Sequence, residues 1–221
     1  MNTGGPSTDD LREHYRRLID KHGLSVVMCW TVLVPEDRTA SFLLEEVGAR
    51  LSGGTLHELH EAAPLSAMVP CDGDTYPVVV DRSGSAIALF EYDYLGSSLP
   101  VLQRLSQGAR VYSAWWNVNF HNRLCFAAGG ELILTVDAFF PGSPDHHPGL
   151  AQWPELAAMT DFFTEFKEED EDDEDDDDYD GYDWMAAWLT VIDQTTGARL
   201  TTEWFQTEHP YVTVCMPDAA R

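Results

Sequence analysis

The sequence predicts an α+β fold, a mainly antiparallel sheet of about six strands with helices packed mostly on one side. Three observations predict it. Residues 24–34 are almost wholly apolar and rich in β-branched side chains, which is typical of a buried central strand. Residues 110–140 alternate apolar and polar side chains in three short runs, which indicates a β-meander. Segments with apolar residues three and four positions apart flank these strands and predict the covering helices.

Helices are predicted where such a segment lies between a capping residue and a glycine or another break. The predicted helices span residues 7–23, 35–48, 98–108, 154–166, 184–197 and 202–205. In the second of them, Phe42, Leu43 and Val47 form the inner face. Further short strands are expected at residues 66–71, 76–81 and 86–92, and an extended segment at residues 211–216.

The meander has a predicted register. Its even-numbered residues form one apolar face, which includes Trp116, Val118 and Phe120, while the odd-numbered residues form a wetter face. A three-residue loop at residues 128–130 pairs Phe126 with Leu132 and keeps the two faces separate. A two-residue turn at residues 129–130 pairs Phe126 with Ile133 instead and mixes them. We therefore expect the three-residue loop.

The net charge of −25 is concentrated in one segment. Residues 167–183 hold thirteen acidic residues and one lysine, so they cannot bury enough apolar surface to offset the entropy of ordering, and we expect them to be disordered. The rest of the chain is also acidic. It should therefore repel nucleic acids and anionic membranes, and we expect neither direct nucleic-acid binding nor membrane binding.

The sequence also predicts the compartment and the domain organisation. Residues 1–6 have no signal-peptide character, and no apolar run approaches the ~18 residues that span a bilayer. The four cysteines lack any metal or redox spacing, which favours free buried thiols and a cytoplasmic location. We expect a flexible N-terminus at residues 1–6 and a single domain at residues 7–221, with the disordered acidic insertion at about 167–183.

Several short motifs carry a resemblance to a known family. They are Cys29-Trp30-Thr31, Trp116-Asn117-Val118-Asn119, Phe139-Phe140-Pro141, Thr196-Gly197-Ala198-Arg199-Leu200-Thr201 with Glu203-Trp204, and His209-Pro210. In this order they resemble an uncharacterised family of actinobacterial proteins, a domain of unknown function, over roughly residues 24–214. The resemblance implies that the acidic run is an insertion in a surface loop. It implies no activity, ligand or catalytic residue.

Metal and cofactor chemistry has weak support. Asp176, Asp178 and Asp180 match the first half of a calcium-binding EF-hand loop, but Ala187 stands where the loop needs a bidentate Glu. The segment is therefore more simply a solvated acidic loop. The histidine pairs at residues 146–147 and at His57 and His60 lack the second pair of ligands that zinc usually takes. We expect no metal and no cofactor, and no catalytic motif favours an enzyme.

The best candidate for a partner contact is Trp115, which the predicted register turns away from the core together with Asn117 and Asn119. The alternative is that a helix also covers this face and buries Trp115. We expect a non-enzymatic intracellular interaction module that binds a basic protein partner through its acidic surface, including Asp176, Asp178 and Asp180. Two alternatives stay open. One is an enzyme whose cleft is built from residues far apart in the sequence, and the other is an acidic inhibitor that mimics DNA.

Overall fold

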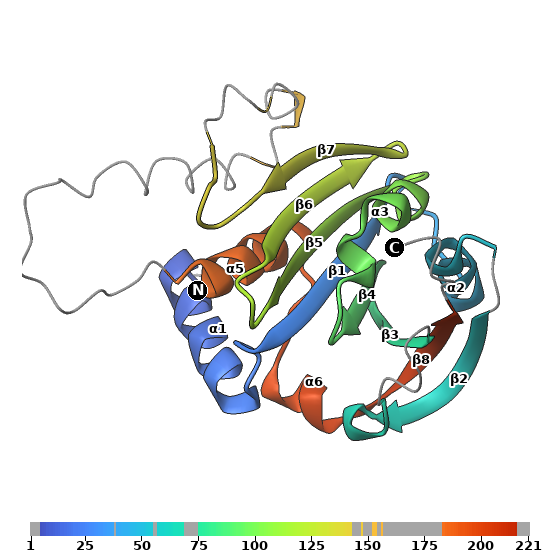
Figure 1. The fold of residues 1–221 in the computed structure, drawn as a ribbon, viewed down its shortest axis with the longest axis horizontal. Helices are drawn as coiled ribbons and strands as arrows, with labels where there is room; N and C mark the ends of the chain where they lie inside the picture. Colours follow the sequence, from blue (N-terminus) through green and yellow to red (C-terminus); the bar gives the residue numbers. More distant parts are fainter. Residues whose placement is uncertain are drawn as a thin grey trace, which may run out of the picture.

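The structure is a computed structural model that describes residues 5–37, 39–54, 57–68, 75–142, 147, 152–153, 156 and 183–215. The strands formed by these residues are β1 (Val27–Pro35), β2 (His57–Pro64), β3 (Thr75–Ser83), β4 (Ala86–Glu91), β5 (Ala109–Asn117), β6 (Asn122–Ala128), β7 (Glu131–Val136) and β8 (Glu208–Cys215). All eight join one antiparallel sheet in the order β2-β8-β3-β4-β1-β5-β6-β7 (Figure 1). The predicted α+β class with an antiparallel sheet is confirmed.

The predicted strand count of about six was too low, because the described residues form eight strands. The strand that the sequence concealed is β2, an edge strand that carries histidines and glutamates and is mostly exposed or half-buried. It lacks the alternation of apolar and polar residues by which strands are recognised. As an edge strand, β2 pairs only with β8 and is covered on part of one face, so few of its side chains need to be apolar. A strand was expected just after it, where residues Leu65–Ala67 instead form the 3₁₀ turn η1.

The helices cover both faces of the sheet, so the expectation that they lie mostly on one side was wrong. They are α1 (Thr8–His22), α2 (Leu44–Ser52), α3 (Leu99–Leu105), α5 (Trp184–Thr196) and α6 (Thr202–Gln206), with the 3₁₀ turn η2 (Leu95–Ser97). One hydrophobic cluster joins the sheet to α1, α5 and α6, and a second joins its other face to α2, α3 and η2. The reason lies in the central strands, since β1 and β4 are apolar on both faces and each face needs cover.

The first helix confirms the predicted caps. Ser7 and Asp10 form a capping box at its start, and Gly23 ends it in the left-handed conformation with φ 64°. The second helix differs from the prediction. It begins at Leu44, because Pro35 is still part of β1 and pairs with Ala109 of β5.

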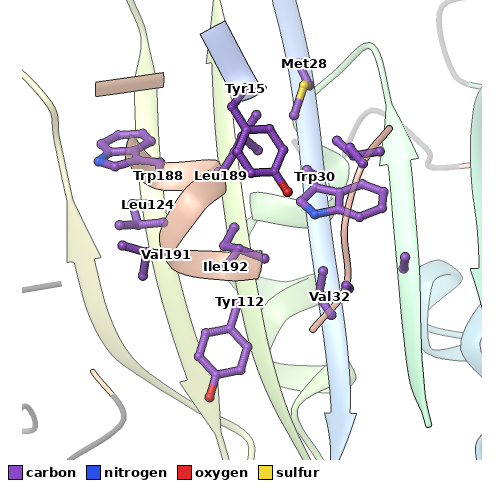
Figure 2. Packing of buried hydrophobic residues seen from close by; sticks show 14 of the residues in the cluster. Tyr15, Met28, Trp30, Val32, Tyr112, Leu124, Trp188, Leu189, Val191 and Ile192 are labelled. Atoms are coloured by element: carbon purple, nitrogen blue, oxygen red, sulfur yellow. The ribbon is translucent and has the colours of Figure 1, made fainter. Parts of the chain in front are cut away.

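The face beneath α1 and α5 is packed with large side chains (Figure 2). Trp30 projects from β1, Tyr15 from α1 and Trp188 from α5, and each is at most 2% exposed. Trp116 of β5 lies on the same face with no exposed area, and its Nε1 donates to the Leu24 carbonyl at 2.7 Å. The predicted inward direction of Trp116 is confirmed.

The β6–β7 hairpin corrects the predicted pairing. The turn has two residues, Gly129 and Gly130, which both adopt positive φ, and Ala127 pairs with Leu132. Phe126 pairs with Leu134, so Ile133 is an extra residue in a β-bulge. The bulge separates the two faces, which a regular hairpin with this turn would have mixed.

Other predictions concern residues outside the described set. They include the helix at residues 154–166 apart from Leu156, the acidic segment up to residue 182 and Cys71. Cys29 and Cys125 are buried free thiols, as expected. Within the described part of the chain, no helix combines the length and the apolar character needed to cross a membrane.

Candidate functional site

Trp115, the predicted partner contact, lies in β5 on the face covered by α2, α3 and η2. Its side chain is half-buried, and its ring meets the Tyr94 ring edge-on with 6.0 Å between centroids. The indole Nε1 is buried and has no hydrogen-bond partner among the described residues. A covering segment therefore lies over part of this face, and Trp115 is half-buried, neither fully exposed nor part of the core.

Asn117 is the last residue of β5, two positions from Trp115 on the same face, whereas Asn119 lies beyond the strand in the β5–β6 turn. The Oδ1 atom of Asn117 accepts from the backbone N–H groups of Asn119 at 3.0 Å and His121 at 3.2 Å. Asn119 is exposed. Asn117 thereby closes the turn and ends β5. The other predicted contact residues, Asp176, Asp178 and Asp180, lie outside the described residues.

The same turn presents exposed apolar side chains. Phe120 is 74% exposed and Val118 60%, although both were expected on the core face of β5. That expectation was wrong because the strand ends at Asn117, after which the alternation of faces no longer applies. Phe139 and Phe140, just beyond β7, are 43% and 83% exposed. We call these four residues the aromatic patch.

Hydrogen bonds from buried or half-buried polar side chains fix the patch. Asn122, only 6% exposed, donates to the Phe120 carbonyl at 2.9 Å and accepts from the Ala138 N–H at 2.6 Å. Asp137 accepts from the N–H groups of Phe139 at 2.9 Å and Phe140 at 3.1 Å. The turn and the segment after β7 are thus held together, and the patch is ordered before any partner arrives.

Phe120 has an unfavourable backbone. Its φ of 61° makes it the one non-glycine residue with positive φ in the described chain. The left-handed region costs an ordinary L-residue roughly 1–2 kcal/mol, whereas glycine or asparagine adopts it more readily. Because the ring is also largely exposed, its burial recovers little of this cost. The stability of the turn does not explain a phenylalanine here.

The patch adjoins the point where the acid-rich segment ends. The Phe139 ring contacts both Phe120 and Trp184 edge-on, with 6.0 Å between centroids in each pair. Trp184 in turn packs on the buried Trp116 at 5.5 Å. Trp184 is the first residue of α5, and Asp183, the last of the acid-rich residues, caps that helix by accepting from Ala186 at 3.1 Å. Exposed aromatic rings and the end of the acidic segment therefore lie next to one another.

A second notable region is a row of polar side chains beneath η2. Cys29 of β1 pairs with Glu91 of β4 on one side and with Trp115 of β5 on the other. In the next row, Thr31 and Ser113 share a hydrogen bond of 2.7 Å. Apart from the half-buried Trp115, these residues are at most 3% exposed. The covering turn approaches this closely only because of Gly96, where a Cβ atom would lie 2.6 Å from the Thr31 Oγ1.

Glu91 is the buried acid of this row. Its Oε1 accepts from the Gly96 N–H at 2.5 Å, while its Oε2 is buried with no hydrogen-bond partner among the described residues. Burial raises the pKa of this carboxyl to about 8, so it is mostly protonated at neutral pH. Burial also raises the pKa of the Cys29 thiol well above its usual value, which makes Cys29 a poor nucleophile.

Glu91 also lines a small hollow. The pairing of β3 with β4 extends only to Val79 and Phe90, and the hollow lies beyond that pair, where β3 continues alongside β8 and β4 ends. Its other lining residues are Leu65, Met68, Tyr76, Pro77, Tyr92 and Asp93. The lining is mainly apolar. Leu65, Met68 and Phe90 belong to the hydrophobic cluster under α1, α5 and α6, whereas the Glu91 carboxyl is bonded to Gly96 of η2 on the other face of the sheet.

In a third cluster, a carboxylate, a histidine and a hydroxyl follow one another as in a hydrolytic triad, but the cluster is not arranged for catalysis. The Nδ1 of His209 lies 3.1 Å from the Asp81 Oδ2, and its Nε2 lies 3.0 Å from the Thr207 Oγ1. That Nε2, however, also lies 2.8 Å from the Trp204 carbonyl, to which the Thr207 hydroxyl donates at 2.9 Å. The hydroxyl proton and the ring nitrogen are both committed to this carbonyl, so the cluster fixes the end of α6.

Metal ligands do not gather in the described part of the chain, where no group of three or more His, Cys, Asp or Glu side chains could hold an ion. His57 and His60 lie in the strand β2, three positions apart, which directs them to opposite faces. His57 lies near Ser52, and His60 stacks on Tyr211.

Sequence inspection missed Phe120, Phe140 and Glu91. The signal for the turn was present, because residues 117–122 include three asparagines, which favour turns over strands. The signal for Glu91 was a single acid at the end of the apolar run of β4. Neither signal shows by itself whether the side chain is exposed or buried, which depends on the elements packed around it.

Comparisons with known proteins give a family but no activity. No curated protein and no solved structure matches this chain. A family of unknown function, DUF6461, matches residues 30–220, which is most of the chain. The predicted resemblance to an uncharacterised family of unknown function is therefore confirmed, and the chain belongs to DUF6461, a family of unknown function.

Proposed function

We propose that this protein is a non-enzymatic interaction module that binds a basic protein partner, with the aromatic patch as the contact surface. The observation that carries the proposal is Phe120, which is 74% exposed and in a strained left-handed conformation. Strain at an exposed position points to function, since burial of this ring recovers little of the cost. Exposed aromatic side chains held in fixed positions are typical anchors of protein interfaces.

Charge supplies the second part of the proposal. The chain has a net charge of −25, and residues 167–183 contribute thirteen acidic residues just before α5. Long-range attraction speeds the encounter with a basic partner and weakens as salt is added. Short-range affinity then comes from desolvating Phe120 and Phe140. Trp115, half-buried against Tyr94, supports this end of the sheet from within.

The proposed compartment is the cytoplasm. Cys29 and Cys125 are buried as free thiols, and burial raises the pKa of Cys125 to about 12. Unpaired thiols of this kind suit a reducing environment. The acidic charge also argues against a nucleic-acid partner, because phosphate would be repelled.

The test is affinity purification from an extract of the source cells with two matched variants of the full chain. The first combines Phe120→Asn with Phe140→Ser. Asparagine accepts the left-handed conformation, so the variant should be at least as stable as the natural protein. The control is Leu43→Asn, because Leu43 is 63% exposed beside α2, which packs on β2 and β8 at the other end of the sheet.

We expect a basic protein to be retained by the natural chain and by the Leu43→Asn control, and lost by the patch variant. With that partner purified, its association rate should fall steeply between low and physiological salt. Replacing residues 168–178 with a Gly/Ser linker should slow association at low salt, while Phe120→Asn should mainly speed dissociation. Retention of the same proteins by the patch variant would overturn the proposal.

A further inference from the structure

We propose that the open edge of β2 pairs with β2 of a second copy of this chain, so that the two sheets join across a twofold axis. This surface is separate from the aromatic patch and independent of the basic partner proposed above. Three observations support it, namely the position of β2 at the end of the sheet, the alternation of histidine and glutamate along the strand, and the fixed position of His60.

The strand β2 has an unpaired edge. It stands at one end of the strand order, and β8 is its one strand neighbour among the described residues. It runs along the rim of the molecule, at the opposite end of the sheet from β7 (Figure 1). All of its side chains are exposed or half-buried. The backbone N–H and C=O groups of an edge strand can pair with another strand, which can therefore approach β2 here.

One symmetric register matches the side chains of β2. Directly paired residues in antiparallel strands either both point their backbone groups at the other strand or both point them away. Since these directions alternate along a strand, two identical strands place their twofold axis at a residue and not between two residues. With the axis at Leu59, the two Leu59 side chains meet. Glu58 then faces His60 of the second copy, and His57 faces Glu61 of the second copy. Every polar pair thus joins a glutamate to a histidine.

The neighbouring registers lack this match. With the axis at Glu58, the two Glu58 carboxylates face each other. With the axis at His60, the two His60 side chains face each other and Leu59 faces Glu61. Like charges directly opposite destabilise a strand pair. Charged residues on an edge strand commonly prevent pairing, and residues of a single sign are enough for that. The alternation in β2 instead makes the strand complementary to its own reverse.

His60 is held in place before any second copy arrives. Its ring stacks on Tyr211 with 4.5 Å between centroids, and its Nε2 lies 2.8 Å from the Thr213 Oγ1. When the Thr213 hydroxyl donates to Nε2, the Nδ1 atom carries the proton and can donate it to a carboxylate. Glu58 is exposed on the same face of β2. Leu59 points to the other face, at the margin of the cluster under α2 and α3, so the two Leu59 side chains would extend that cluster.

The contact should be weak and should strengthen with salt. The pairing of β2 with β8 shifts register between His60 and Ala63, and this bulge limits the regular part of the edge to residues 57–60. Each copy also carries a net charge of −25, so two copies repel each other at long range. Salt screens this repulsion over about 8 Å at physiological ionic strength, whereas the paired side chains are closer than that. The basic partner proposed above should show the opposite dependence on salt.

The test is sedimentation equilibrium of the full chain from micromolar to millimolar concentration, at low and at physiological salt. We expect the average mass to rise with concentration from that of one chain towards twice that value, and to rise further at the higher salt concentration. A mass that stays at one chain throughout overturns the proposal. The proposed function survives that outcome, because a single chain presents the whole aromatic patch.

Matched variants show whether β2 forms the contact. Glu58→Lys places a cation opposite His60 of the second copy at both symmetric positions, so it should weaken the dimer by at least about tenfold. Glu131→Lys makes the same change of charge at an exposed position of β7, on the other edge of the sheet, and should leave the dimer intact. Equal dimerisation of these two variants overturns the proposal.

A double variant separates lost complementarity from structural damage. Glu58→Lys combined with His60→Glu again pairs opposite charges, in the reverse sense, so it should dimerise within a few-fold of the natural chain. It should not form mixed dimers with the natural chain, because Glu58 would then face a glutamate. Thermal denaturation shows whether each variant is folded. A folded double variant that stays monomeric also contradicts the proposal.

Discussion

The two faces of the sheet are stabilised in different ways. The face under α1 and α5 buries large rings, and the indole of Trp116 there is paired with a carbonyl. The face under η2 buries Cys29, Thr31 and Glu91, and leaves polar atoms of Glu91 and Trp115 unpaired. An unpaired buried polar group costs roughly 1–3 kcal/mol. The first face is stabilised mainly by packed apolar rings, although the His22 Nε2 of α1 is also buried without a partner among the described residues, and the second face keeps a buried carboxyl that stability does not explain.

The largest effect is expected on the first face. Trp116→Ala removes a fully buried ring together with its hydrogen bond to Leu24, so the free energy of unfolding should fall by about 3–5 kcal/mol. Urea denaturation measures this. A loss below about 1 kcal/mol would contradict the comparison, because the ring would then contribute no more than an exposed side chain.

The second face should show the stronger dependence on pH. Glu91 has a pKa near 4.5 when unfolded and about 8 when folded, so the folded protein keeps its proton longer as the pH rises. The resulting contribution to the free energy of unfolding is fully present below pH 4.5 and is lost progressively as the pH rises to about 8. Glu91→Gln cannot lose a proton. Its stability relative to the natural chain should rise by on the order of 3 kcal/mol between pH 5 and pH 8.

The measurement is urea denaturation of both proteins at several pH values, with the difference between them as the readout, since other groups cancel in it. Glu45→Gln serves as the control and should show a flat difference. A flat difference for Glu91→Gln as well would mean that Glu91 is solvated in the folded protein.

Gly96→Ala tests how closely η2 approaches the polar row. The new methyl group would lie 2.6 Å from the Thr31 Oγ1 and 3.2 Å from the Glu91 Oε1, so the turn must move outward. We expect a loss of about 1–3 kcal/mol, as for other overpacked sites. Gly5→Ala is the matched control, because nothing lies within 4 Å of the added atom. Equal thermal stability of the two variants would show that η2 is loosely packed.

Cys125→Ser should have the smallest effect. Cys125 lies on the second face near the Thr135 hydroxyl at 3.8 Å, which a serine can still reach with a small adjustment. The loss should be about 1 kcal/mol, several times less than for Trp116→Ala on the opposite face. Chemical denaturation of the two variants side by side tests the ranking, and a reversed order would contradict it.

The sequence predicted those features that depend on neighbouring residues. The caps of α1, the glycine that ends α5 and the inward direction of Trp116 all follow from local spacing and backbone preferences. The resemblance to an uncharacterised family of unknown function was also stated from the sequence, and the family model matches residues 30–220. These features need no knowledge of what packs against them.

Only the tertiary structure decided the rest. The edge strand β2 exists because β8 pairs with it, and the bulge at Ile133 exists because the two faces of β7 have different coverings. The candidate sites differ in this respect. The end of β5 at Asn117, which leaves Phe120 exposed, is a local feature, but the Glu91 carboxyl is buried because β1, far from β4 in the sequence, pairs with β4, and η2 closes over both strands. Burial of this kind depends on neighbours from distant parts of the chain, which the local sequence does not record.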